Sequence, residues 1–187
     1  MNHHQHNFRY DEKERLKRQN PENILVNINL KEGMFFIDLG SNEGFFSLPA
    51  ARIVGTKGKV VALDIDESAL KRLEKKLKIE GINNTEIVLG PAEKRLPYKE
   101  KADIIFLGTV LHDFEDPVKV LKNAKYMLKP SGLIYNFDWR KVHGDIGPPY
   151  EIRLNEADVL KIVQEAGLKI MSSAIIDNNF YETRIIK

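Results

Sequence analysis

Asp38, Gly40, Gly44 and Asp64 are the residues whose types and spacing point most directly to chemistry. The first three lie in or beside a turn that follows a run of apolar residues, and Asp64 ends a second apolar run twenty residues after Gly44. Glycines allow the backbone to approach a ligand closely, and an acid at this distance suits a ribose with free 2′- and 3′-hydroxyls. The spacing therefore predicts the first half of a nucleotide-binding unit.

Strands and helices that alternate along the chain would hold these residues at one edge of a sheet. Short apolar runs predict strands at 34–39, 60–64, 86–89, 102–107 and 133–137, and amphipathic segments predict helices at 45–54, 67–80, 116–128 and 156–166. We also expect a helix at 11–19 and another that starts at Pro21. Asp66 and Asn155 are expected to cap helices, and Pro49 predicts a late start or a kink in helix 45–54.

The last two predicted strands, 168–176 and 180–186, are separated by a turn of only three residues, 177–179. A connection this short requires an antiparallel hairpin. We therefore predict an α/β fold with a Rossmann-like doubly wound sheet of seven strands, mostly parallel with one antiparallel C-terminal strand. A long polar and aromatic loop is expected at 138–153, and helix 116–128 is expected to stop at the Lys-Pro-Ser-Gly sequence 129–132.

Length and composition suit a single globular domain. The 187 residues, of which 42% are apolar and 30% charged, predict one domain at 21–187 after a flexible N-terminal segment with a cap helix at 1–20. A net charge of +2 gives no sign of the basic field of a nucleic-acid binder. Because long apolar runs, a signal-peptide core and cysteine are all absent, we expect a cytoplasmic location, no membrane partner and no thiolate metal site.

Four segments, by their order and spacing, resemble the class I S-adenosylmethionine-dependent methyltransferases. They are IDLGSNEG at 37–44, VVALDID at 60–66, ADIIFLGTVLHDFEDP at 102–117 and LKPSGLIYNFDW at 128–139. The predicted C-terminal hairpin fits the same family. The chain is most similar to the small group that includes the ubiquinone/menaquinone-biosynthesis-type enzymes. This resemblance implies an enzyme of the methyltransferase class that uses S-adenosyl-L-methionine as its cofactor.

The resemblance also implies which residues bind the cofactor. The family motif, an acid followed by three alternating glycines, has Asn42 in place of its middle glycine, and asparagine tolerates left-handed backbone. Asp38 and Gly40 are expected near the methionine moiety. Asp64 is expected to accept hydrogen bonds from both ribose hydroxyls, because an ionised carboxylate only accepts. The full set of expected cofactor residues is Asp38, Gly40, Ser41, Asn42, Gly44, Asp64, Ile65, Ala92, Glu93 and Leu107.

The adenine end departs from the family pattern. Family members often carry an acid just after the third strand, where this chain has Pro91, which offers neither a carboxylate nor a backbone donor. Ala92 can offer its amide, Glu93 can either substitute for the acid or face solvent, and Ile65 is expected to pack against the adenine.

The methyl acceptor is expected beyond the fourth and fifth strands. His112 follows the fourth strand and is a candidate general base or substrate contact, although it could equally pack the following turn. Tyr10, Trp139 and Tyr150 are further candidates for the acceptor pocket, with ordinary surface or loop packing as the alternative for each. The histidines at positions 3, 4 and 6 belong to a polar tail, and we expect no metal site there.

The implied reaction is in-line displacement, which transfers a methyl group to a small-molecule acceptor and leaves S-adenosylhomocysteine. We expect a monomer or a homodimer. Two other readings remain open: a non-catalytic S-adenosylmethionine-binding protein, and a nicotinamide-dependent oxidoreductase. The oxidoreductase predicts glycine at position 42, a second mononucleotide-binding half and no terminal hairpin.

Overall fold

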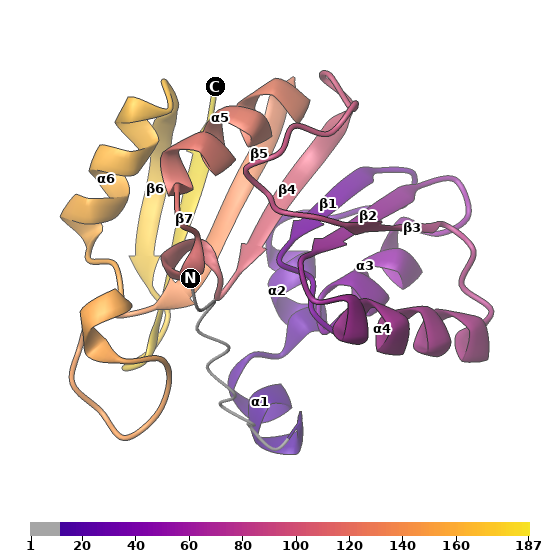
Figure 1. Cartoon of the computed structure of the whole chain (residues 1–187), viewed down its shortest axis with the longest axis horizontal. Coiled ribbons are helices and arrows are strands. Elements are labelled where there is room, and N and C mark those ends of the chain that lie inside the picture. The colour runs from indigo at the N-terminus through magenta and orange to yellow at the C-terminus, as the bar shows by residue number, and fades with distance from the viewer. Residues whose placement is uncertain (1–11) are drawn as a thin grey trace.

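Residues 12–187, which the computed structural model describes, form one sheet of seven strands in the order β3-β2-β1-β4-β5-β7-β6 (Figure 1). The strands are β1 (Phe35–Leu39), β2 (Lys59–Asp64), β3 (Thr85–Leu89), β4 (Ala102–Gly108), β5 (Leu128–Trp139), β6 (Lys169–Ile175) and β7 (Phe180–Ile186). Among these seven strands only β7 runs against the others, because it pairs antiparallel with both β5 and β6. The predicted fold class is therefore confirmed.

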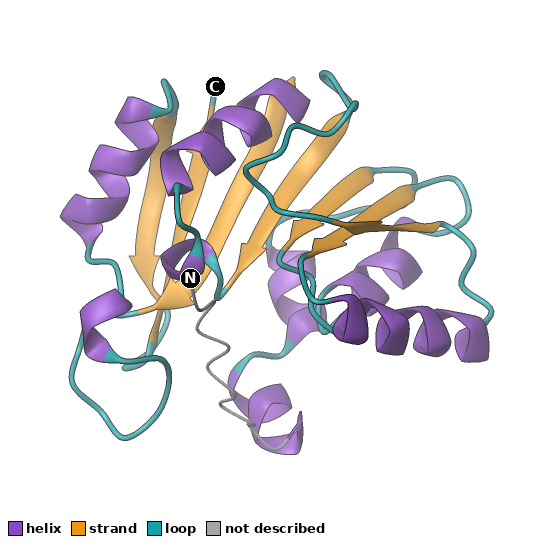
Figure 2. Ribbon diagram, viewed as in Figure 1, coloured by secondary structure: helices purple, strands orange, loops and turns teal. Residues whose placement is uncertain are grey.

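Helices cover both faces of the sheet (Figure 2). They are α1 (Glu12–Arg18), α2 (Pro21–Asn27), α3 (Ser47–Val54), α4 (Glu67–Glu80), α5 (Pro117–Met127) and α6 (Glu156–Glu165), with short 3-10 helices η1 (Leu111–Asp113) and η2 (Tyr150–Ile152). Successive residues of a strand point to opposite faces, so Ile37 of β1 packs in the cluster under α5 and α6, while Phe36 packs under α2 and α3. Leu73 of α4 packs on Ala62 of β2, in a cluster that includes Leu48 of α3.

The helix boundaries follow the capping residues that the sequence indicated. The Asp66 carboxylate accepts from the first free amides of α4, and Gly81 ends that helix in a left-handed conformation with φ 66°. Asn155 and Asp158 form a reciprocal capping box at the start of α6. Because α3 begins only at Ser47, Pro49 lies within its first turn, which confirms the predicted late start.

The fifth strand is longer than predicted. The helix α5 ends at Met127, close to the stop expected at 129–132, but β5 begins at Leu128, so the predicted strand start at residue 133 is wrong. Leu128 pairs with Ala102, and a register shift just after Ala102 takes up residues 130–132. At its other end β5 includes Asp138 and Trp139, because β7 pairs with both residues. The expected loop at 138–153 is therefore shorter than predicted, and it contains η2.

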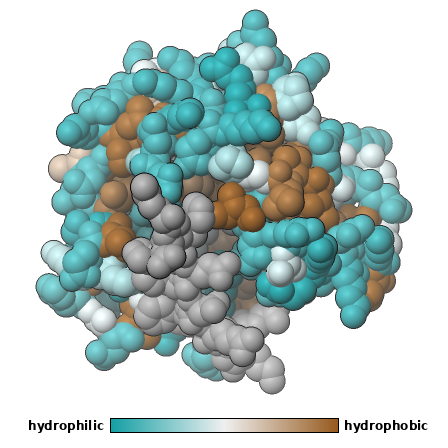
Figure 3. All heavy atoms as spheres, in the orientation of Figure 1, coloured by the Kyte–Doolittle hydropathy of each residue, from teal (hydrophilic) through white to brown (hydrophobic). Residues whose placement is uncertain are grey.

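The chain segments that follow β1, β2, β4 and β5 meet at the carboxyl edge of the sheet, where open α/β sheets bind ligands. The helix α1 reaches this edge too, since the guanidinium carbon of Arg15 lies 3.9 Å from the centre of the Phe45 ring. In the space-filling view, hydrophilic side chains cover the helices and apolar groups show between them (Figure 3). No helix among the described residues is long and apolar enough to cross a membrane.

Candidate cofactor and acceptor site

Three residues with left-handed backbone shape the turn after β1. They are Gly40, Asn42 and Gly44, with φ values of 80°, 47° and 85°. A Cβ atom at Gly40 would lie 2.6 Å from Cγ2 of Val110, and one at Gly44 would clash with Leu73. Both glycines are therefore required by close packing as well as by conformation. Asn42 occupies the left-handed position that its residue type tolerates.

Asp64 joins this turn to the end of β2. Its Oδ2 accepts a hydrogen bond of 2.7 Å from the backbone amide of Asn42, and its Oδ1 accepts one of 2.9 Å from the amide of Asp66. These two bonds fix the plane of the carboxylate. Each carboxylate oxygen has two lone pairs, so both oxygens can still accept from a pair of ribose hydroxyls. The geometry fits the ligand that the sequence indicated.

Two buried polar groups lie at the start of the same turn. Oδ2 of Asp38 accepts a hydrogen bond of 2.5 Å from the hydroxyl of Ser47. Burial raises the pKa of the Asp38 carboxyl to about 7, against the lowering effect of the Ser47 hydrogen bond. The hydroxyl of Ser41 is buried and has no hydrogen-bond partner within the described residues. Unpaired polar atoms are rare in protein interiors, so these groups fit a polar ligand in the turn.

An apolar platform lies beside Asp64. Ile65 is 54% exposed and Leu89 is 56% exposed, and Leu89 pairs with Asp64 in the register of β2 and β3. Two exposed apolar side chains at the carboxyl edge suit the face of an adenine ring. Sequence reasoning missed Leu89, although its position at the end of a strand, just before Gly90, was a usable signal.

The other residues expected near the adenine have different surroundings. Ala92 is buried, and its carbonyl accepts a hydrogen bond of 3.1 Å from the side chain of Asn123 in α5. Glu93 is half-buried in the loop that follows β3. Leu107 is fully buried in β4 and packs in the cluster beneath α5 and α6. Roles for these three residues stay predictions.

A strained residue turns the chain after β4. Thr109 has a φ of 58°, which is unfavourable for a β-branched side chain and costs of order 1–3 kcal/mol. Its amide donates a hydrogen bond of 2.6 Å to the carbonyl of Phe137 in β5, which holds this conformation. The turn brings Val110 onto Gly40 and places His112 of η1 against β5.

His112 and Asp138 form a buried pair. Nδ1 of His112 lies 2.7 Å from Oδ1 of Asp138, and the two side chains are only 3% and 1% exposed. Burial lowers the pKa of His112, but the charge and hydrogen bond of Asp138 outweigh it, so that pKa is raised above its ordinary value. Sequence reasoning missed Asp138, which it placed in a loop. The available signal was the alternation of Asn136 and Asp138 with aromatic residues, a strand-like period.

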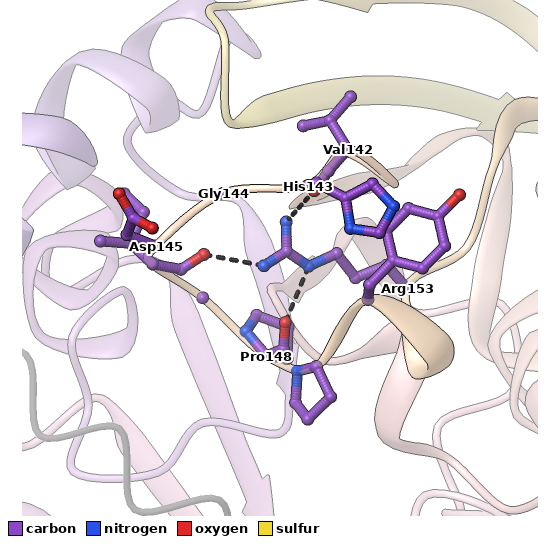
Figure 4. Close-up of a pocket in the computed structure, with 10 residues that line it drawn as sticks. Val142, His143, Gly144, Asp145, Pro148 and Arg153 are labelled. Atoms are coloured by element: carbon purple, nitrogen blue, oxygen red, sulfur yellow. Dashed lines mark hydrogen bonds between the residues drawn. The ribbon is translucent and has the colours of Figure 1, made fainter.

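Arg153 holds the loop between β5 and η2 in place. Its guanidinium donates four hydrogen bonds of 2.7–3.2 Å to backbone carbonyls of this loop, as the close-up shows in part (Figure 4). The loop lines an open pocket of about 200 Å³. Tyr150 lines this pocket, and its ring stacks on that of His143, with 4.1 Å between the two ring centres. Trp139, by contrast, is 5% exposed and packs against Phe180 on the α3 side of the sheet.

The remaining acceptor candidate, Tyr10, lies outside the described residues, as do the histidines at positions 3, 4 and 6. The structure thus brings together Asp38, Gly40, Asn42, Gly44 and Asp64 at one turn. It places His112 on the neighbouring segment, next to Asp138.

Comparisons with known proteins show which family the chain resembles. Residues 30–181 match a family model described as a methyltransferase domain. The demethylmenaquinone methyltransferase of Geobacillus stearothermophilus is 29% identical over 113 residues, which are 60% of this chain and 48% of that protein. The ubiquinone/menaquinone biosynthesis C-methyltransferase UbiE of Escherichia coli O1:K1 is 34% identical over 114 residues, which are 60% of this chain and 45% of that one. The chain therefore spans about half the length of the curated relatives it matches.

A solved structure covers more of the chain. The crystal structure of a SAM-dependent methyltransferase from Aquifex aeolicus superposes with a TM-score of 0.87 at 30% identity, over 95% of each chain. Because the family model matches well over half of the sequence and this neighbour nearly all of it, the chain belongs to the methyltransferase domain family, with the class I fold of S-adenosylmethionine-dependent methyltransferases.

Proposed function

We propose that this protein transfers the methyl group of S-adenosylmethionine to a small-molecule acceptor by in-line displacement, leaving S-adenosylhomocysteine. The observation that carries the proposal is the position of Asp64. Its carboxylate is fixed by the amides of Asn42 and Asp66 at the edge of the left-handed turn, with lone pairs left for two ribose hydroxyls.

Different residues around the turn bind different parts of S-adenosylmethionine. Ile65 and Leu89 offer an apolar surface to the adenine, and Asp64 binds the ribose. The turn at 40–44 and the buried Asp38 receive the methionine part, which carries an ammonium group. The electron-poor methyl group that S-adenosylmethionine supplies is already bound to a good leaving group. The protein therefore has mainly to align the acceptor and exclude water, and such positioning can contribute roughly 7–11 kcal/mol in favourable systems.

The small-molecule acceptor is supported by the curated relatives, whose names describe methylation in quinone biosynthesis. The terminal hairpin of β6 and β7 argues against the nicotinamide-dependent alternative, which predicts none.

The proposal is tested by calorimetric titration of the full chain with S-adenosylhomocysteine, comparing Asp64→Asn with Asp66→Asn. Both substitutions remove one negative charge within two residues of each other. Asparagine is as good a helix cap as aspartate, so Asp66→Asn should keep its affinity within about twofold. Asp64→Asn should bind about 10–100-fold more weakly, because hydrogen bonds to a charged group contribute about 1.5–3 kcal/mol.

Three other results would lead to different conclusions. Binding of NAD without binding of S-adenosylhomocysteine would establish the oxidoreductase. Tight binding of S-adenosylmethionine without turnover over a broad acceptor panel would make the protein a non-catalytic binder. If the two substitutions changed the affinity for S-adenosylhomocysteine equally, Asp64 would not be a ligand of the cofactor.

A further inference from the structure

The buried pair of His112 and Asp138 has a geometry that the binding of a methyl donor does not require. The pair joins η1, which follows β4, to the end of β5, and both lie at the carboxyl edge of the sheet. We propose that His112, oriented by Asp138, is the general base for an acceptor that carries a phenolic or enolic hydroxyl group. This inference rests on the methyl transfer proposed above and specifies its acceptor class.

The hydrogen bonds of Asp138 fix the form of the imidazole. Oδ1 of Asp138 accepts from the backbone amide of Trp139 at 2.8 Å and faces Nδ1 of His112 at 2.7 Å. Because an ionised carboxylate can only accept, Nδ1 carries the ring proton and Nε2 presents a lone pair. Nε2 lies 3.5 Å from the carboxylate of Asp113, whose side chain is exposed. Asp138 is thus a positioning residue, and Nε2 of His112 is the basic atom.

The charged groups around His112 favour its protonated form over that of an ordinary histidine. Burial lowers its pKa, as does the positive charge of Arg153 from the loop, while Asp138 of β5 and Asp113 of η1 raise it, with a net rise. Tyr181 of β7 faces Asp138 and stays protonated, since burial and then the Asp138 charge raise its pKa. A raised pKa makes Nε2 a stronger proton acceptor than that of an ordinary histidine.

Two buried polar atoms on this face of β5 lack a hydrogen-bond partner among the described residues. They are Oδ2 of Asp138 and Oδ1 of Asn136. The Tyr181 hydroxyl lies 3.4 Å from Nδ2 of Asn136. A buried polar atom without a partner costs roughly 1–3 kcal/mol. Such atoms need an explanation in a native structure, and one explanation is a catalytic role. Two acceptor oxygens suit a ligand that donates hydrogen bonds, as a hydroxyl compound does.

The pair is also next to the turn that binds the donor. Val110 packs against Gly40, and His112 follows two residues later. Along the carboxyl edge, the order of the strands places Asp64 after β2, Gly40 after β1, His112 after β4 and Asp138 in β5. An acceptor near His112 would therefore lie on the side of the turn opposite the ribose.

The proposed step balances as follows. The acceptor O–H proton moves to Nε2 of His112, and the resulting imidazolium is held by the Asp138 carboxylate. The acceptor oxygen, or the carbon conjugated with it, forms a bond to the methyl carbon, while the carbon–sulfur bond breaks and its electron pair stays on sulfur as a neutral thioether. The proton on Nε2 is then released to solvent. No oxidant or reductant is needed.

The first experiment measures His112 without turnover. In ¹⁵N-labelled full-length protein saturated with S-adenosylhomocysteine, the His112 signals are assigned by their loss in His112→Gln and titrated by NMR. We expect a proton on Nδ1 in the neutral form and a pKa above the ordinary histidine value. In Asp138→Asn, we expect titration at clearly lower pH. A neutral form with its proton on Nε2 would overturn the proposal, because Nε2 could not then accept one.

The second experiment varies the acidity of the acceptor. Wild type, His112→Gln and Asp138→Asn are assayed for S-adenosylhomocysteine release with 2-naphthol, catechol and anaerobic 1,4-dihydroxynaphthalene, and with 4-nitrophenol at a pH where it is ionised. Both variants should lose about 10²–10³-fold in kcat on the weakly acidic acceptors but less than about fivefold on 4-nitrophenol, which needs no base. Glu115→Gln, an exposed change three residues from His112, should behave as wild type.

The outcomes separate this inference from the proposed function. If wild type binds no S-adenosylhomocysteine, the proposed function fails. If wild type binds S-adenosylhomocysteine but methylates none of these hydroxyl compounds, this inference alone is overturned. The same holds if His112→Gln lowers kcat by the same factor on every acceptor, because His112 is then not a base. If one variant does not fold, as judged by thermal unfolding, the other variant and the NMR titration of wild type show whether His112 acts as a base. Product analysis distinguishes oxygen from carbon methylation.

Discussion

The backbone amide of Asn42 donates a hydrogen bond of 2.7 Å to Oδ2 of Asp64, and this bond links the turn after β1 to the acid that ends β2. Asn42 has left-handed backbone, with φ 47°. The residue that departs from the glycine motif is therefore the one that orients the proposed ribose ligand. Its left-handed conformation has a measurable consequence.

Asn42→Gly should retain the affinity for S-adenosylhomocysteine within about twofold, because glycine adopts positive φ without strain. Asn42→Val should destabilise the fold by about 1–2 kcal/mol, the usual cost of left-handed backbone for an ordinary residue. It should also weaken binding at least fivefold, since the amide no longer fixes Asp64. Thermal unfolding and calorimetry measure both effects. Equal behaviour of the two variants would show that the conformation at 42 is unimportant.

Gly40→Ala should abolish binding of S-adenosylhomocysteine. The new Cβ would lie 2.6 Å from Cγ2 of Val110, so either the turn or the segment leading to η1 must move. The double variant Gly40→Ala/Val110→Ala removes the clash but keeps the strain of φ 80°. It should recover part of the binding, and calorimetry of both variants tests this. No recovery would mean that the backbone strain, rather than contact with Val110, excludes a side chain.

Asp38 should make stability fall as pH rises from about 4 to 7. Burial raises the pKa of its carboxyl in the folded protein to about 7, whereas the unfolded chain ionises near pH 3.9. Between these values the folded state binds a proton that the unfolded state has lost, so the free energy of unfolding decreases with pH and stays lower above pH 7. Asp38→Asn should match wild type near pH 4 and be more stable by roughly 2–4 kcal/mol at pH 8.

Denaturant unfolding between pH 4 and 8.5, without ligand, measures this difference. Asp145→Asn, at an exposed position of the loop after β5, is the matched control and should follow the wild-type curve. Parallel curves for Asp38→Asn and wild type would contradict the burial of an ionisable Asp38.

Arg153→Met should loosen the loop after β5. The loop carbonyls of Arg140, Val142, Ile146 and Pro148 would lose the guanidinium, whose hydrogen bonds we expect to stabilise the fold by roughly 2–4 kcal/mol in total. Amide hydrogen exchange at 140–150 should become faster while exchange in the central strands changes little. Lys161→Met, an exposed cation on α6, is the control and should leave the loop unchanged. Unchanged exchange in Arg153→Met would show that the loop is held by its own backbone.

Much of the fold could be predicted from the sequence, because it depends on local patterns. Apolar runs gave the parallel strands, Asp66 and Asn155 gave two helix starts, and the short turn at 177–179 required a hairpin. The fifth strand was too short in the prediction because Pro130 and Gly132 read as a helix stop. The helix does end before these residues, but pairing with β4 begins at Leu128 and pairing with β7 reaches Trp139, so tertiary contacts extend the strand at both ends.

The candidate site, like the fold, has parts that the sequence predicts and parts that depend on tertiary structure. The sequence by itself determined the turn motif and the spacing to Asp64, since both belong to one strand–turn–helix–strand segment and their chemistry follows from residue type. Only the tertiary structure decided that His112 meets Asp138, twenty-six residues away, and that Val110 closes over Gly40. Those contacts depend on how β4 and β5 pair and on the strained turn at Thr109. A neighbour brought near by sheet pairing leaves no mark in local sequence spacing. The glycine-bearing turn and His112 could therefore be named from the sequence, whereas Asp138, the partner of His112, could not.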